Sequence, residues 1–207
     1  MIFSEIKILT RKNLDDAGVT FYATIDIDDS IQDAYDDITA VSKCLPKKTT
    51  INWQQDQVYY DFIILGVTDY LGSIAIYNQN NKRWLQDNLT LPQLNNNTFN
   101  WELSKGTPEW WIPVSFKYVA FHSIYSIASG SFDLYYWAKA PIVINTDTPL
   151  ISTDMQTLLM LYSTADLLEQ AEEYSKANVF WEEYFSKLNI YKDRCDNLAK
   201  TDLLVLM

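Results

Sequence analysis

The strongest constraint in the sequence is an apolar pattern near its C-terminus. Seven residues follow one another at alternating steps of four and three: Ala177, Trp181, Tyr184, Leu188, Tyr191, Cys195 and Leu198. This spacing keeps one apolar stripe on one side of a helix. Charged residues occupy the outward positions: Lys176, Glu182, Glu183, Lys187, Lys192 and Asp193. The pattern predicts a helix whose stripe packs against another helix.

The preceding segment can supply that second helix. Its apolar residues make a broad stripe: Met155, Leu158, Leu159, Tyr162, Ala165, Leu168 and Ala171. Ser152, Thr153 and Asp154 offer a capping hydroxyl and first-turn negative charge at its start. We therefore predict a C-terminal helical hairpin over residues 151–200. Such a hairpin indicates core packing and carries no function by itself.

Two shorter helices are expected in residues 1–48. The first covers residues 4–14, with Ser4 as its cap and Gly18 in the left-handed exit that follows. The second begins with Thr24 as its cap and ends near Leu45, because Pro46 follows. Its apolar residues repeat the same spacing: Ile27, Ile31, Ala34, Ile38, Val41 and Leu45.

The other side of this second helix is acidic. It carries five aspartates: Asp26, Asp29, Asp33, Asp36 and Asp37. Carboxylates at such spacing can bind a divalent cation or share a proton, but hard-metal sites normally gather oxygen ligands from a loop or from several elements. A solvated face, with the early aspartates favoured by the helix dipole, is the better interpretation. No metal site is predicted.

The periodicity changes between Pro46 and Pro149. Four short segments are rich in Tyr, Phe, Val and Ile and partly alternate, as strands do: residues 57–65, 73–77, 114–122 and 132–138. A helix is expected within residues 91–104. The predicted fold is therefore α+β: a helical bundle, made of the N-terminal helices and the C-terminal helical hairpin, with an inserted antiparallel β-rich region. The predicted divisions are residues 1–48, 49–150, 151–200 and an apolar tail, 201–207.

Composition narrows the class of protein. With 207 residues, 48% of them hydrophobic, the chain can bury the core of one domain, or of one domain that carries an inserted region. A net charge of −11 argues against a free-standing nucleic-acid binder and suits a surface that DNA passes without being held. Aromatic residues make up 14%, which suits protein interfaces, although single rings are more often core.

Cysteine usage and hydropathy point to a reducing compartment. Glu5, Lys7 and Arg11 interrupt the apolar residues at the N-terminus, so no signal peptide is expected. Cys44 and Cys195 are then expected to be free thiols. No window approaches eighteen consecutive apolar residues, so we expect no membrane span.

The sequence contains no assembled set of catalytic groups. The single histidine, His122, lies in a predicted strand without a recognisable Ser or Cys partner, which favours a packing role. Glycine-rich phosphate loops and cysteines at zinc spacing are absent from the sequence. Glu109 and Asp133 could be imagined as a glycosidase pair near Trp110, Trp111 and Trp137, but sequence distance gives no geometry. We predict no catalytic residue, no cofactor and no enzymatic activity.

Several short motifs follow one another in a defined order. They are Leu14-Asp15-Asp16-Ala17-Gly18, Phe21-Tyr22, Gln32-Asp33-Ala34, Tyr59-Tyr60-Asp61-Phe62, Thr107-Pro108-Glu109-Trp110-Trp111, Leu134-Tyr135-Tyr136 and Lys139-Ala140-Pro141. This order resembles that of the tailed-bacteriophage head-to-tail adaptor family, also called connector or head-completion proteins. The triplet at residues 32–34 replaces an Asn-Glu-Ala-like motif of the family, and residues 77–103 match the family only loosely.

The resemblance implies a structural virion protein at the head–tail interface, made in the host cytoplasm. Members of the family form rings, typically of twelve copies, beneath the portal protein. They receive the tail tube or tail nozzle protein on the other side. DNA passes through the lumen without specific binding. The implied partners are therefore further copies of this chain, the portal and the tail.

The last residues make an apolar tail: Leu203, Leu204, Val205, Leu206 and Met207. A monomeric soluble protein seldom leaves such a segment in water. By analogy with the family, the tail is expected to bind the portal. The alternative is that it folds back onto its own bundle.

A second function belongs to another class. The chain could be a monomeric aromatic-lined ligand- or carbohydrate-binding module, because aromatic walls with a few polar groups form small-molecule sites. A ring of many subunits would favour the adaptor. A stable monomer that binds glycans would favour the module.

Overall fold

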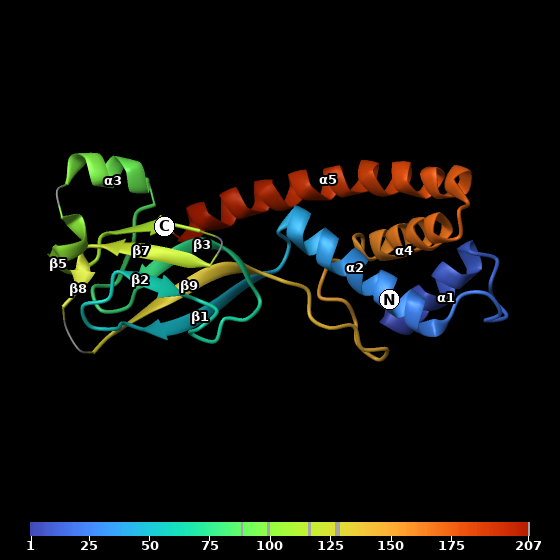
Figure 1. Cartoon of the computed structure of the whole chain (residues 1–207), viewed down its shortest axis with the longest axis horizontal. Helices are drawn as coiled ribbons and strands as arrows, with labels where there is room; N and C mark the ends of the chain where they lie inside the picture. Colours follow the sequence, from blue (N-terminus) through green and yellow to red (C-terminus); the bar gives the residue numbers. More distant parts are fainter. Residues whose placement is uncertain (88, 99, 116, 127–128, 207) are drawn as a thin grey trace. The chain divides into compact units, whose positions relative to one another are not determined.

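The structure is a computed structural model that describes residues 1–206 except 88, 99, 116 and 127–128, and no side chain of residues 97 and 198–206 is described. The chain is mixed α and β, with five α-helices and antiparallel sheets in its described part, which confirms the predicted α+β class. It divides into two compact units (Figure 1). One contains Met1–Leu45 with Lys139–Met207, and the other contains Pro46–Ala138.

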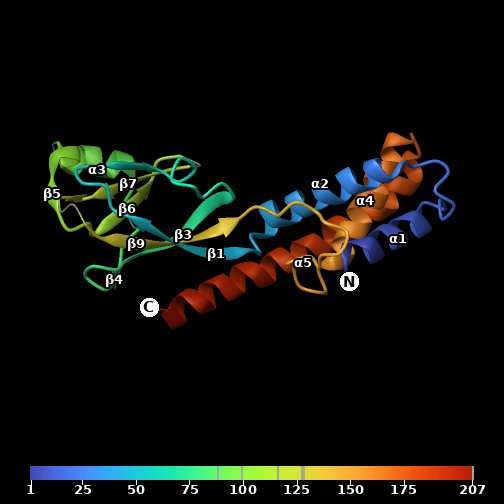
Figure 2. The ribbon, with the colours of Figure 1, turned by 90° about the horizontal axis from the view of Figure 1, so that it is seen from below.

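The first unit is helical. Its helices are α1 (Phe3–Asn13), α2 (Thr24–Ser42), α4 (Gln156–Gln170) and α5 (Tyr174–Leu206). Helix α4 contacts the other three and lies between α5 and the pair α1 and α2 (Figures 1 and 2). Its buried residues include Leu158, Leu159, Ala165 and Leu168.

The predicted packing of the last two helices is confirmed. The Tyr162 ring of α4 meets Trp181 and Tyr184 of α5 edge to face, with ring centroids 5.0 and 5.3 Å apart. Ala177, Tyr184 and Leu188 are buried, whereas Trp181, Tyr191 and Cys195 are half-buried. The Leu198 side chain lies outside the described part. The burial of the stripe thus weakens along α5.

The predicted helix ends need correction. Helix α4 begins after Met155, which makes no side-chain cap, so the predicted caps at residues 152–154 are wrong. Helix α5 continues to Leu206, past the predicted end at residue 200. Leu203–Leu206 are therefore helical instead of forming a tail after the last helix, and Met207 lies outside the described residues.

At the N-terminus, the predicted caps are replaced by other contacts. Ser4 does not cap α1; the Glu5 carboxylate accepts a hydrogen bond from the Ile2 N–H at 3.0 Å. Thr24 does not cap α2; its hydroxyl accepts from Arg11 at 3.2 Å. The predicted left-handed exit at Gly18 is also wrong, because the positive φ angles fall at Asp15 and Val19. The contact that replaces the Ser4 cap is local, whereas the one at Thr24 comes from a residue of the preceding helix.

The second unit contains two antiparallel sheets. The first has the order β1-β9-β3-β4, formed by β1 (Pro46–Asn52), β9 (Ser131–Ala138), β3 (Tyr70–Asn78) and β4 (Arg83–Trp84). The second has the order β2-β7-β6, formed by β2 (Tyr59–Asp61), β7 (Tyr118–His122) and β6 (Trp110–Pro113). A short parallel pair joins β5 (Lys105–Gly106) to β8 (Ile124–Tyr125).

Each of the four predicted strand segments contains or overlaps an observed strand, namely β2, β3, β7 and β9. The helix expected within residues 91–104 is α3 (Leu91–Asn97), followed by a 3₁₀ turn (Trp101–Leu103). Strands β4, β5, β6 and β8 also lie outside the four predicted segments, and the longest strand that was not predicted is β1. It is an edge strand that begins with proline and two lysines, and such a composition lacks the usual strand signal.

An aromatic cluster fills the centre of this unit. The Trp53 ring lies 4.5 Å from Phe132, 4.8 Å from Phe121, 5.1 Å from Tyr125 and 6.0 Å from Tyr60, measured between centroids. These rings come from both larger sheets and from β8. Much of the aromatic content of the chain therefore stabilises a core, through area burial and edge-to-face packing.

The segment that returns from the sheet is tied to α2 by Tyr35. The Tyr35 ring is buried, and its hydroxyl accepts a hydrogen bond from the Leu150 N–H at 2.7 Å. Burial raises the pKa of Tyr35 to about 12, so the hydroxyl stays protonated at neutral pH. This contact fixes the approach to α4.

Tyr35→Phe tests that contact, because it removes the hydroxyl and keeps the ring. We expect the free energy of unfolding to fall by about 1 kcal/mol, the usual net value of one such hydrogen bond. Urea denaturation measures it. Tyr174→Phe, at an exposed ring of α5, is the control and should change stability by less than about 0.5 kcal/mol. Equal effects of the two substitutions would contradict the assignment.

Candidate interaction surface

The loop between α1 and α2 is organised by the carboxylate of Asp16. We call residues 14–25, which are this loop and the first two residues of α2, the Asp16 loop. The first carboxylate oxygen accepts hydrogen bonds from the N–H groups of Thr20 at 2.9 Å and Phe21 at 3.0 Å. The second accepts from the Tyr22 N–H at 3.2 Å and from the Arg11 guanidinium at 2.7 Å. One buried side chain thus fixes the backbone of an irregular segment.

The electrostatics of this carboxylate are decided by its hydrogen bonds. Burial alone raises the pKa of Asp16, but the N–H groups of Phe21, Thr20 and Tyr22 outweigh burial and lower the pKa to about 2. Arg11 supplies the compensating charge and also donates to the Tyr22 carbonyl at 3.1 Å. The ionised form is therefore part of the folded loop at neutral pH.

The fixed loop leaves apolar side chains in water. Phe21 is 74% exposed, and Val19 and Ile25 are also exposed. Val19 has a φ of 55°, an uncommon and costly angle for a β-branched residue. A surface held in one conformation loses less conformational entropy on binding than a mobile one. The Asp16 loop is therefore our candidate protein-binding surface.

Sequence reasoning singled out residues 14–18 and the Phe21-Tyr22 pair only as motifs. It assigned no role to Asp16 and placed the turn at Gly18. The sequence offered one signal: Asp16 lies a few residues before Thr20, Phe21 and Tyr22, whose N–H groups are not bonded within a helix or strand. That signal is weak without the fold, since Asp is common in turns for local reasons.

Helix α5 exposes further apolar residues that lie outside its predicted stripe. They are Val179, Phe185 and Ile190, and Tyr174 is exposed at its start. Phe185 stacks on Trp181 with centroids 5.6 Å apart, which holds its ring against the helix surface. The Asp16 loop and α5 are therefore two of the places where the helical unit exposes apolar side chains.

The predicted portal-binding residues lie at the end of α5. The backbone of Leu203, Leu204, Val205 and Leu206 is helical, and Met207 is outside the described residues. Their side chains are not described. The predicted binding role of these five residues stays a prediction.

His122 lies on β7 among aromatic rings. It stacks on Trp110 with ring centroids 5.6 Å apart and meets Trp101 edge to face at 6.3 Å. Its Nδ1 is buried and has no hydrogen-bond partner within the described part of the chain. Burial lowers the pKa of His122, and the negative charge of Glu109 partly opposes this shift. These contacts indicate that the His122 ring has a packing role.

The structure gives Glu109 and Asp133 separate partners. Glu109 forms an ion pair with Arg83 at 2.9 Å. Asp133 is buried on β9, where Lys48 and the Thr50 hydroxyl each approach it at 2.7 Å. The geometry does not assemble these two carboxylates into one site.

The acidic face of α2 is mostly solvated. Asp26, Asp29, Asp33 and Asp36 are exposed, whereas the half-buried Asp37 accepts a hydrogen bond from the Tyr184 hydroxyl. Burial raises the pKa of Asp33, with further contributions from Asp166, Asp36 and Asp29. Over the residues that the structure covers, no group of three or more His, Cys, Asp or Glu could hold a metal ion.

Cys44 and Cys195 are both free and half-buried. Burial raises the pKa of each thiol, and the nearby Cys44 raises the pKa of Cys195 further. In the same described part of the chain, no helix is long and apolar enough to cross a membrane.

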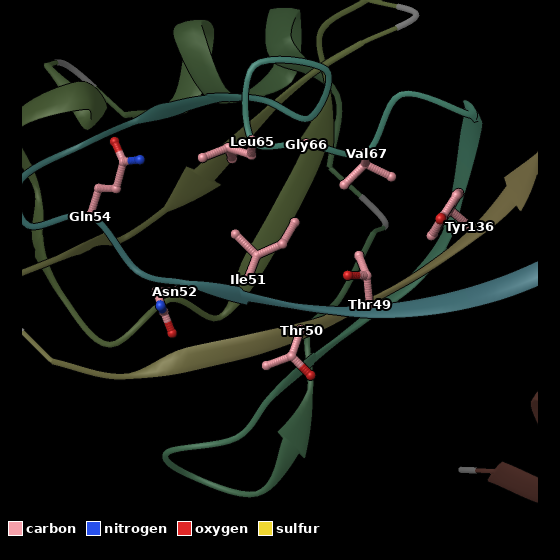
Figure 3. A pocket seen from close by; sticks show the side chains of 9 residues that line it. All are labelled: Thr49, Thr50, Ile51, Asn52, Gln54, Leu65, Gly66, Val67 and Tyr136. Carbon is pink, nitrogen blue, oxygen red and sulfur yellow. The ribbon is translucent and has the colours of Figure 1, made fainter.

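The described part of the second unit is hollowed in more than one place. One pocket, of about 380 Å³, is lined by Thr49, Thr50, Ile51, Asn52, Gln54, Leu65, Gly66, Val67 and Tyr136 (Figure 3). Another, of about 590 Å³, is lined by Tyr70, Leu71, Gly72, Ser73, Trp111, Pro113, Val114 and Ser115. Trp111 is the tryptophan among these lining residues.

The chain was also compared with known proteins. No protein-family model matches it, and no curated protein matches it.

The role of Asp16 is tested by Asp16→Asn. The amide keeps the size but loses the charge and one acceptor oxygen, so the Thr20, Phe21 and Tyr22 amides should exchange hydrogen at least about tenfold faster. Exchange followed by NMR or mass spectrometry measures this. Asp15→Asn changes the exposed neighbour and is the control. Unchanged exchange in Asp16→Asn would refute the assignment.

Acid should have the same effect on the unaltered protein. The pKa of Asp16 in the folded chain, about 2, lies below its ordinary value of 3.8. The carboxylate therefore stabilises the loop fully above pH 3.8, and this contribution is lost as the pH falls toward 2. Exchange at these amides, corrected for intrinsic rates, should rise over that interval in the unaltered chain and stay flat in Asp16→Asn.

Proposed function

We propose that this chain is a structural virion protein, a head-to-tail adaptor of a tailed bacteriophage. In this proposal, copies form a ring between the portal and the tail and complete the DNA channel. The helical unit corresponds to a bundle of N-terminal helices and a C-terminal hairpin, and the β-rich region is an insertion in it. The motif order from residues 14–18 to residues 139–141 supports the family, and the division of the chain into two units is compatible with it.

The observation that carries the proposal is apolar surface held in place by polar contacts. On the Asp16 loop, a buried ion pair and backbone hydrogen bonds fix a segment whose Phe21, Val19 and Ile25 side chains point into water. Exposed aromatic and aliphatic side chains on a preorganised segment are typical of protein-binding surfaces. Assembly would bury them.

Charge supports the proposed passage of DNA. The chain carries −11, and four exposed aspartates lie along α2. Each copy in a ring multiplies that charge around a shared axis. An acidic channel repels phosphate and lets a genome move without being held.

The end of α5 is the proposed portal contact. Because the backbone is helical through Leu206, the apolar residues 203–206 would bind as part of a helix, which is a common way to fill an apolar groove. The alternative is contact with the chain's own bundle.

The proposal is tested by the mass and shape of the assembled protein. Mass photometry and electron microscopy of the full chain, with and without the portal, should give a ring with a central channel. A stable monomer that binds glycans and ignores the portal would support the ligand-binding module instead. A stable monomer with neither activity would contradict both functions.

Phe21→Ser should weaken assembly without unfolding the chain. Truncating an aromatic side chain at the centre of an interface costs about 2 kcal/mol or more, so the concentration needed for self-association should rise at least about 30-fold. Mass photometry over a dilution series measures it. Leu103→Ser is the matched control, since Leu103 is 72% exposed and lies in the other unit. Equal effects of both changes would argue against the Asp16 loop as the contact.

Deletion of Thr201–Met207 separates the two interpretations of the tail. If the tail binds the portal, the shortened chain keeps its stability and its ring but loses association with the portal in a pull-down. If the tail folds back, the free energy of unfolding falls instead. Unimpaired association with the portal would reject docking.

A further inference from the structure

Strand β1 presents a free edge. It is the outer strand of its sheet and pairs only with β9 there, in the order β1-β9-β3-β4. Just beyond its end, the Trp53 N–H donates to the Gly130 carbonyl at 2.9 Å. In an antiparallel pair, the residues that bond across alternate along the strand. The backbone groups of Lys48, Thr50 and Asn52 therefore point away from β9, and none has a hydrogen-bond partner among the residues described.

Half of this edge lacks the charged residues that prevent another strand from pairing with it. Lys47 and Lys48 are charged residues of the kind that blunt strand edges, although Asp69 and Asp133 pair with them. Beyond them, residues 49–52 carry no charge and line the 380 Å³ pocket. In Figure 3, Ile51 points from β1 toward Leu65 and Val67 across this pocket, and Thr50 points the opposite way. The open edge thus borders a pocket of mixed lining, in which Ile51 faces Leu65 and Val67 and the other lining residues are mostly polar.

A second unpaired segment follows β9. Residues 139–145 have no helical or strand assignment. The Gln32 carboxamide bonds to one side of this segment, accepting from the Val143 N–H at 2.7 Å and donating to the Pro141 carbonyl at 3.4 Å. A neighbouring strand bonds alternate residues in the same way. The Ile142 N–H and carbonyl face the other side and have no partner in the described part of the chain.

The composition of this segment is typical of a β-strand, although the segment belongs to no sheet. Its core is Ile142-Val143-Ile144, and β-branched residues favour strands. Ile142 is 82% exposed, and Ile144 is also exposed. A polar side chain therefore holds an apolar segment on the surface. On its outer side the Ile142 N–H and carbonyl are free in the described part of the chain, whereas the Ile144 carbonyl accepts from the Asp147 N–H at 2.9 Å.

We infer that residues 140–145 of one copy add as a strand to the free edge of β1 in a neighbouring copy. The inference rests on the proposed ring and names one contact between its subunits. Strand addition would satisfy the outward backbone groups of Thr50, Asn52 and Ile142 at once. It would also bring an isoleucine side chain against Ile51, Leu65 and Val67.

A second copy is the occupant that the chain itself specifies. Each copy carries one free strand edge and one unpaired extended segment, so the two surfaces occur in equal number. They are different surfaces, and a contact between different surfaces is head-to-tail, which closes into a ring when the rotation allows. An unrelated partner would leave one of the two unpaired in every copy.

Mixed crosslinking tests this contact. The full chain is prepared as Cys44→Ala with Cys195→Ala, and in that background Asn52→Cys and Ile142→Cys are made separately. The two proteins are mixed and treated with a short flexible bismaleimide, which tolerates a shift in register. We expect a mixed dimer, at a yield at least about tenfold above that from Lys105→Cys with Ile142→Cys, because a held pair reacts at millimolar effective concentration. A yield equal to this control would overturn the inference.

A backbone substitution gives a second, independent measurement. Asn52→Pro removes an outward N–H and leaves the pairing with β9 intact, since proline is tolerated at the outer side of an edge strand. Asn52→Ala is its control. We expect the proline variant to self-associate at least about tenfold more weakly at an unchanged melting temperature, as loss of backbone bonds at an interface predicts. Equal self-association of the two variants would also overturn the inference.

These results are distinguishable from failure of the proposed function. Rings that form without the mixed crosslink reject strand addition and leave the adaptor proposal standing. A chain that neither assembles nor crosslinks rejects both.

Discussion

The helical unit depends on the burial of α4. This helix packs against α1, α2 and α5, which come from both ends of the sequence, and Leu158 and Leu159 are among its buried residues. Those ends are separated by the whole of Pro46–Ala138. The entropy of closing so long an excursion grows only slowly with its length, so apolar burial on α4 can outweigh it. The β-rich unit can therefore be carried between the helices without weakening them.

Irregular backbone in this unit is stabilised by single polar side chains. Asp16 accepts hydrogen bonds from three consecutive residues of its loop, and Gln32 bonds Val143 and Pro141 of the segment after β9. In both places the polar side chain replaces a helix or sheet as the partner of the backbone. The apolar side chains of these segments are then left outside. The hydrogen bonds of Asp16 and Gln32 thus stabilise the fold and also keep these apolar side chains available for binding.

The β-rich unit uses its aromatic residues differently. Trp53 and the rings around it are buried between the two larger sheets, and His122 stacks within a neighbouring aromatic group. Abundant aromatic residues in this chain therefore reflect core packing as much as interaction. This unit can bind a partner through the unpaired edge of β1. The groups that would bind are backbone N–H and carbonyl groups, which amino-acid composition does not reveal.

The sequence alone determined the α+β class, the packing of the last two helices and the four more apolar strand segments, because local periodicity records which face of an element is buried. It missed β1, and it misplaced the caps at Ser4 and Thr24 and the turn at Gly18. Some of these features depend on partners distant in sequence, such as Arg11 for Thr24, which no local pattern contains. The candidate surface was visible only as a motif around Asp16. Tertiary structure decided its meaning, since only folding brings one carboxylate to several N–H groups and leaves Phe21 in water.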